Sequence, residues 1–203
     1  MRYPKLRELR EALKALLSRP FTTDFPHKPH LPFERFRGRP YFHEEDCVGC
    51  TACAQVCPAK AIDVEDDLSS AVPKRKLTVR WDICICCGNC EANCLTGKGI
   101  RLSREFDYAT CEDRTSLVHS VEKELMVCEA CQKEIVPVDQ YGWVAKKLGP
   151  LVFTNSSLML FYLRMIRLSS NRKSSPKAEA EFKRADRIKV LCPRCRREAV
   201  LKS

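Results

Sequence analysis

Eight cysteines in two matching runs constrain this chain of 203 residues more than any other feature. The first run starts at Cys47 and the second at Cys84, and both have the spacing C-x2-C-x2-C-x3-C. The runs are half-copies of one another, because the same offset separates Cys47 from Cys84 and Cys57 from Cys94. Three cysteines spaced in this way can surround three corners of a metal cluster from one short loop. The fourth cysteine lies on the helix that follows.

This spacing is the one that two-cluster bacterial-type ferredoxins use, where the fourth cysteine of each run ligates the other cluster. We therefore predict two [4Fe–4S] clusters with crossed ligands. Gly49 and Gly88 lie where the backbone must turn tightly and direct amide N–H groups toward sulfur. Two disulfide-rich loops are the alternative interpretation, which the match of all eight cysteines makes the weaker one. The predicted ligands are Cys47, Cys50, Cys53 and Cys94 for the first cluster, and Cys84, Cys87, Cys90 and Cys57 for the second.

Cysteine usage and charge indicate the compartment and the kind of partner. The x2 spacing of the cysteines is typical of metal ligands in a reducing compartment. The N-terminus shows no apolar region of a secretory signal, so we expect a cytoplasmic protein. The formal net charge is +10, and residues 164–203 hold 13 basic and 4 acidic side chains. A basic flank of this kind can face nucleic acid, anionic lipid or an acidic subunit.

The first 41 residues are expected to form an amphipathic helix and an extended arm. Leucines recur at helical spacing from Leu6 to Leu17 with Lys and Arg between them, which predicts a helix that ends by Pro20. A helix at the membrane surface or in a partner's groove is preferred to one packed on its own domain, because its polar side is basic. The prolines and aromatic residues of 21–41 favour an extended arm over a disordered linker.

The rest of the chain is predicted to be a ferredoxin domain followed by an extension. Short strands are expected at 61–64, 77–81 and 100–102, with 65–76 as an inserted turn, and residues 113–127 are expected to be helical. The predicted fold class is α+β, a bacterial-type two-cluster ferredoxin fold with an N-terminal amphipathic helix and arm and a C-terminal zinc-ribbon-like extension. The predicted domains are 1–41, 42–106 and 107–203.

Two further C-x2-C pairs, far apart in the sequence, predict a third metal site. Two such pairs can close a tetrahedral site of four thiolates, which is typically structural zinc. A rubredoxin-like iron and free thiols are the alternatives. The remaining cysteines, Cys86 and Cys111, are expected to be unligated. The predicted zinc ligands are Cys128, Cys131, Cys192 and Cys195.

The segment between these pairs carries an insert at about 145–189. Its apolar part, 148–168, is too interrupted by polar residues to span a membrane, so we expect a docking helix there. The following stretch 169–189 is polar, charged and rich in serine, and is expected to be mobile.

The chain resembles the two-cluster ferredoxin-like subunit of respiratory complex I and its relatives in energy-converting, membrane-bound [NiFe] hydrogenases. The resemblance rests on Phe36-Arg-Gly-Arg-Pro40, on both cysteine runs, on Pro58 and on Trp81-Asp-Ile-Cys84. The pairs Cys128/Cys131 and Cys192/Cys195 are more similar to the iron–sulfur subunit of formate hydrogenlyase. The departures are Leu95 in place of a proline, the basic tail and the insert.

The resemblance implies a non-catalytic electron-transfer subunit, peripheral on the cytoplasmic face of the membrane. It would pass single electrons from a soluble donor, or a donor subunit, to a small hydrogenase-like subunit that carries its own cluster. The sequence shows no candidate nucleophile, general-base constellation or nucleotide-binding glycine loop, and its four histidines are scattered. The alternatives are a diffusible ferredoxin and a nucleic-acid-binding zinc-ribbon protein with an iron–sulfur domain. The basic tail motivates the latter, but no nucleic acid is expected as a partner.

Overall fold

The computed structural model describes residues 5–111, 113–169 and 182–201, and it divides into two units, Met1–Phe36 and Arg37–Ser203. The first unit contains helix α1, Leu6–Leu17, in which the backbone N–H of Lys5 donates to the Glu8 carboxylate at 3.2 Å. No residue of α1 is buried. The predicted amphipathic helix is therefore confirmed, and its leucine stripe, at Leu6, Leu9, Leu13, Leu16 and Leu17, is exposed.

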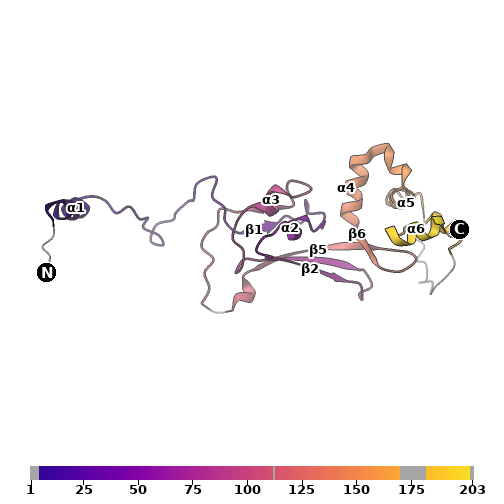
Figure 1. Ribbon diagram of the computed structural model, residues 1–203, viewed down its shortest axis with the longest axis horizontal. Helices are drawn as coiled ribbons and strands as arrows, with labels where there is room; N and C mark the ends of the chain where they lie inside the picture. Colours follow the sequence, from indigo (N-terminus) through magenta and orange to yellow (C-terminus); the bar gives the residue numbers. More distant parts are fainter. Residues whose placement is uncertain (1–4, 112, 170–181, 202–203) are drawn as a thin grey trace. The chain divides into compact units, whose positions relative to one another are not determined.

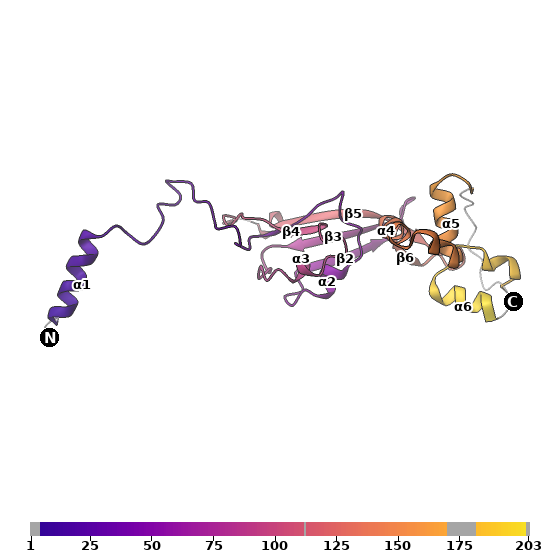
Figure 2. The ribbon, with the colours of Figure 1, turned by 90° about the horizontal axis from the view of Figure 1, so that it is seen from above.

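In the second unit, the two cysteine runs fold into matching pieces. Each run leads into one short helix, α2 (Ala52–Gln55) after the first loop and α3 (Asn89–Ala92) after the second. The two helices contact one another and appear close together in Figure 2. Strand β1 (Pro40–Phe42) pairs with β4 (Ile100–Leu102), which follows the second run, so the start and end of this region are joined.

A four-stranded antiparallel sheet supports these loops (Figure 1). Its order is β2 (Ile62–Asp67), β3 (Lys74–Arg80), β5 (Val118–Val127) and β6 (Glu134–Pro137). The strands predicted near 61, 77 and 100 are confirmed, and the fold mixes helices and sheet as expected. The predicted turn at 65–76 is shorter than expected, because β2 and β3 continue into it as far as the pair Asp67–Lys74.

The predicted helix at 113–127 is wrong. Residues Arg114–Ser116 form one turn of 3-10 helix, and the rest is strand β5. Alternate residues of β5 lie on the same face of the sheet as the core residues of β3 with which they pair: His119 pairs with Val79 and Val121 with Leu77. The strand pattern is hidden in the sequence because two of the inward positions, His119 and Lys123, are polar.

The hydrophobic core lies between this sheet and the cysteine loops. Leu77, Val79 and Ile100 are almost completely buried, and Trp81 donates its Nε1–H to the carbonyl of Pro40 at 2.8 Å. Side chains of two cysteines, Cys47 and Cys53, belong to the same cluster of buried residues. The core therefore reaches the thiols of the first loop, and Cys90 of the second loop packs against it.

The C-terminal part is helical and basic. The 148–168 segment forms a 3-10 helix and a helix, which confirms the helix predicted there, whereas most of the predicted mobile stretch 169–189 lies outside the described residues. In the part of the chain that the structure describes, no helix is long and apolar enough to cross a membrane. The elements are α4 (Val138–Leu148), 3-10 helix Gly149–Thr154, α5 (Ser156–Met165), 3-10 helix Arg184–Arg187 and α6 (Pro193–Leu201).

The environment of His119, on the inward face of β5, leads to a testable prediction. Its Nδ1 accepts the N–H of Phe42 at 3.3 Å, and its ring packs on the rings of Tyr41 and Trp81. Burial, helped by the nearby His43, lowers the pKa of His119 below its usual 6.5. The unfolded chain then binds more protons than the folded chain, so this group makes stability fall as the pH drops below about 6.5. We expect His119→Gln to weaken that fall, measured as thermal unfolding midpoints at about pH 5.5 and pH 7. If His119→Gln showed the same change of unfolding midpoint between the two pH values as the wild type, His119 would not be the group responsible.

Candidate metal centres

The second unit contains two small cavities, and each of them is lined by cysteines from both runs. One cavity has Cys47, Cys50 and Cys53 from the first loop and Cys94 from the end of the second run. The other has Cys84, Cys87 and Cys90 from the second loop and Cys57 from the end of the first. Apolar residues complete the walls, including Leu77 in the first cavity and Val79 in the second. These are the two crossed groups that the sequence predicts as ligand sets.

The backbone repeats itself around the two cavities in more detail than the cysteines alone require. Residues with a left-handed backbone conformation occur at equivalent places in both runs. Gly49 (φ 67°) matches Cys86 (φ 50°), and Thr51 (φ 63°) matches Gly88 (φ 83°). A third pair, Lys60 and Gly97, follows each run. Both glycines singled out in the sequence thus take a positive φ, but each has a non-glycine counterpart that accepts the same strained conformation.

Hydrogen-bond donors face sulfur in both cavities. The N–H of Ala61 donates to Cys57 Sγ at 3.3 Å, and the N–H of Cys86 donates to Cys84 Sγ at 3.4 Å. The hydroxyl of Thr96 lies 3.4 Å from Cys94 Sγ. Donors of this kind stabilise thiolates and the sulfurs of a bound cluster, and they tune its reduction potential.

Burial holds several of these thiols in the protonated form when no metal is bound. It is the largest cause that raises the pKa of Cys53 to about 12 and those of Cys84 and Cys90 to about 11. A thiol ligand must be deprotonated, so metal binding has to displace these protons. The arrangement suits a strongly bound polynuclear metal centre and leaves the free thiols poor nucleophiles.

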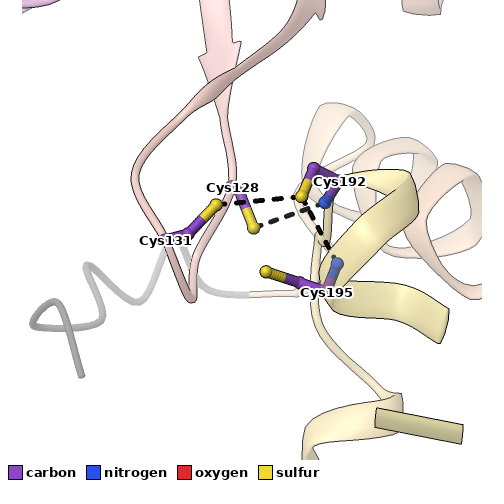
Figure 3. A group of neighbouring side chains, drawn as sticks. All are labelled: Cys128, Cys131, Cys192 and Cys195. Atoms are coloured by element: carbon purple, nitrogen blue, oxygen red, sulfur yellow. Dashed lines mark hydrogen bonds between the residues drawn. The ribbon is translucent and has the colours of Figure 1, made fainter. Parts of the chain in front are cut away.

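The third group of cysteines is compact (Figure 3). Cys128 and Cys131 come from the turn between β5 and β6, while Cys192 and Cys195 lie at the start of α6. Their four Sγ atoms all lie within 4.8 Å of one another, and those of Cys131 and Cys192 are 3.7 Å apart. In a tetrahedral site with metal–sulfur bonds of about 2.3 Å, neighbouring sulfur atoms are about 3.8 Å apart, so these four cysteines fit one metal ion.

Backbone N–H groups of the third site donate hydrogen bonds to its own sulfur atoms. The N–H of Cys192 donates to Cys128 Sγ at 3.3 Å, and the N–H of Cys195 donates to Cys192 Sγ at 3.5 Å. Burial alone would raise the pKa of Cys128, but donors from Cys131, Cys192 and Ala130 outweigh it and lower that pKa. Burial raises the pKa of Cys195. The Cys128 thiol is thus easily deprotonated for metal binding, whereas the Cys195 thiol loses its proton only when a metal displaces it.

The two remaining cysteines differ in position. Cys111 is exposed. Cys86 borders the cavity of the second loop, and its Sγ lies 3.9 Å from the hydroxyl of Tyr108. This contact could not be predicted from the sequence, since Tyr108 lies beyond both runs and only the fold brings it to the loop.

The position of Cys86 yields a prediction. Its counterpart is Gly49, and the left-handed conformation costs a non-glycine residue about 1 kcal/mol or more. We expect Cys86→Gly to leave the iron content unchanged and to stabilise the loop by up to about 1 kcal/mol. Iron analysis and thermal unfolding test this, with Cys87→Ser as the matched variant that should lose iron. Loss of iron from Cys86→Gly would show that Cys86 is a ligand.

Comparison with known proteins identifies the class of domain to which this region is similar. Residues 40–63, which contain the first cysteine run, match the family described as the 4Fe-4S binding domain. The match lies in the part of the chain that provides one loop, Cys57 and the strand β1. It supports iron–sulfur chemistry at these cavities.

Two similar proteins are named as subunits of an NAD(P)H-quinone oxidoreductase. NAD(P)H-quinone oxidoreductase subunit I of Gloeobacter violaceus is 35% identical over 81 residues, which are 38% of this chain and 39% of that protein. Its counterpart in Synechocystis is 39% identical over 59 residues, 29% of this chain and 31% of that protein. The chain thus matches less than half the length of these relatives. The predicted resemblance to the ferredoxin-like subunit of complex I is confirmed.

The chain is also similar to a solved structure. It is that of the membrane-bound sulfane sulfur reductase, an archaeal respiratory membrane complex. The identity is 26%, the TM-score is 0.40, and the match covers 56% of this chain and 60% of that one.

Proposed function

We propose that this chain is a non-catalytic subunit that relays single electrons through two [4Fe–4S] clusters in a membrane-bound oxidoreductase. The single observation that carries the proposal is the pair of cavities in which three cysteines of one run meet the fourth cysteine of the other. The match to the 4Fe-4S binding domain and the similarity to quinone oxidoreductase subunits support it.

Bound clusters would supply reversible one-electron redox chemistry. The chain's own residues would hold the clusters, exclude water from them and donate hydrogen bonds to their sulfurs. The eight cysteines hold the two centres next to one another, because each run contributes to both cavities. Leu77, Val79 and Ile100 exclude water from their inner sides. Donors such as the N–H groups of Ala61 and Cys86 face the sulfurs. No residue needs to form a bond to a substrate.

The same proposal places the chain beside a membrane on its cytoplasmic side and among other subunits. Helix α1 presents exposed leucines next to a basic polar side, which suits an anionic membrane surface. Partners of the expected kind are a donor subunit or ferredoxin and a small hydrogenase-like subunit with its own cluster. We assign one zinc ion to Cys128, Cys131, Cys192 and Cys195, where four thiolates leave no position for a substrate.

Metal analysis and purification from membranes test the proposal. Anaerobically purified full-length chain should contain about eight irons, eight sulfides and one zinc, and its reduced form should show interacting cluster signals in the EPR spectrum. About four irons, or zinc alone, would contradict the two-cluster assignment. The chain should co-purify from membranes with oxidoreductase subunits. A soluble monomer that keeps its redox activity would instead indicate a diffusible ferredoxin.

A further inference from the structure

One arginine lies against the second cysteine loop without a counter-ion. The Nη1 of Arg37 donates to the backbone carbonyl of Cys87 at 3.0 Å. A Cβ added to Gly88 would lie 3.8 Å from Cδ and from Nε of Arg37, so the side chain crosses this glycine in close contact. Among the residues that the structure describes, none offers Arg37 a carboxylate. Arg37 is exposed, so water partly screens its charge, but no carboxylate of the described residues pairs with it beside the loop.

Two cations also contact the first loop, and both of them are paired with a carboxylate. Arg75 Nη1 donates to the carbonyl of Gly49 at 3.3 Å, yet the same guanidinium makes two bonds to Asp66, of 2.7 and 2.6 Å. Lys123, whose side chain would contact a Cβ on Gly49, pairs with Asp139 at 2.9 Å. Both of these cations therefore have a carboxylate partner, which reduces but does not remove their effect on the loop.

We propose that Arg37 raises the reduction potential of the cluster held by Cys57, Cys84, Cys87 and Cys90. Reduction adds one electron, and hence one negative charge, to a centre that is already negative. A nearby cation without a carboxylate partner stabilises the reduced form more than the oxidised form, whereas a cation paired with a carboxylate has a smaller net effect. Arg37 is thus a tuning residue for this site. This inference depends on the proposed two-cluster function.

The test is a redox titration of the anaerobically purified full chain with dithionite, followed by EPR. We expect Arg37→Gln, which keeps hydrogen-bond donors but loses the charge, to lower the reduction equilibrium constant of one cluster about three- to tenfold. A tenfold change corresponds to about 59 mV for a one-electron couple. Arg37→Lys keeps the charge and should leave the potential close to that of the wild type. Lys146→Gln, which removes one exposed charge from α4, is the matched control and should shift neither cluster.

A reciprocal variant assigns the effect to one cluster. Asp66→Asn frees the charge of Arg75 beside Gly49, so it should raise the potential of the cluster that Arg37→Gln leaves unchanged. Equal potentials in Arg37→Gln and wild type, or the same shift in Arg37→Lys, would overturn the inference. A wild-type chain without about eight irons would instead overturn the proposed function, so the two failures are distinguishable.

Discussion

Replacing Cys57 by serine should damage the cluster of the second loop and spare the cluster of its own run. Cys57 lines the cavity of Cys84, Cys87 and Cys90, where its Sγ accepts a hydrogen bond from the N–H of Ala61. Cys94 lies in the opposite cavity. A serine oxygen is a poor substitute for a thiolate, so that one centre should lose iron, and the iron content should fall toward about four per chain.

Two reference variants make the outcome unambiguous. Cys87→Ser removes a ligand that belongs to the second loop under any scheme, and Cys50→Ser does the same for the first loop. The reduced EPR spectrum of Cys57→Ser should match that of Cys87→Ser and differ from that of Cys50→Ser. Cys94→Ser should show the reverse pattern. If Cys57→Ser instead resembled Cys50→Ser, each run would hold its own cluster and the crossed assignment would be wrong.

The grouping of cysteines was predictable because the spacing of both runs matches that of two-cluster ferredoxins, in which the fourth cysteine of each run ligates the other cluster. Both cavities have that composition. The pair of distant C-x2-C motifs was predictable because two such pairs can close a tetrahedral site of four thiolates, although the segment between Cys131 and Cys192 hides their proximity. Side-chain chemistry at a fixed spacing carries such information without knowledge of the fold.

The features that could not be predicted depend on strand register. Strand β5 appeared helical because Lys123 and His119 occupy inward positions, and only the pairing with β3 shows why they are tolerated there. The same register places Asp66, Arg75 and Lys123 side by side on one face of the sheet, next to Gly49. The left-handed conformations of Thr51 and Cys86 are also invisible in the sequence, because neither residue type indicates a positive φ.

Disruption of the third site should detach the C-terminal segment while leaving both clusters in place. The core around this site consists of Cys128, Leu191, Cys192, Cys195 and Ala199, so three of its five buried residues are the thiols themselves. Apolar burial on this scale cannot order α6 by itself. Binding of structural zinc to zinc-finger peptides contributes about 10–16 kcal/mol, and a contribution of that size here would exceed what so small a core can supply.

We therefore expect Cys192→Ser to lose the zinc and to expose residues 182–201 to protease, with iron content and EPR signals unchanged. Limited proteolysis and hydrogen exchange of the full chain measure this directly, and Cys111→Ser, at an exposed cysteine outside every group, is the matched control. Treatment of the wild type with a zinc chelator should give the same digestion pattern as Cys192→Ser. If the segment kept its protection in Cys192→Ser, its order would come from other contacts, such as those of Arg196 with the carbonyls of Arg187 and Lys189, and not from the metal.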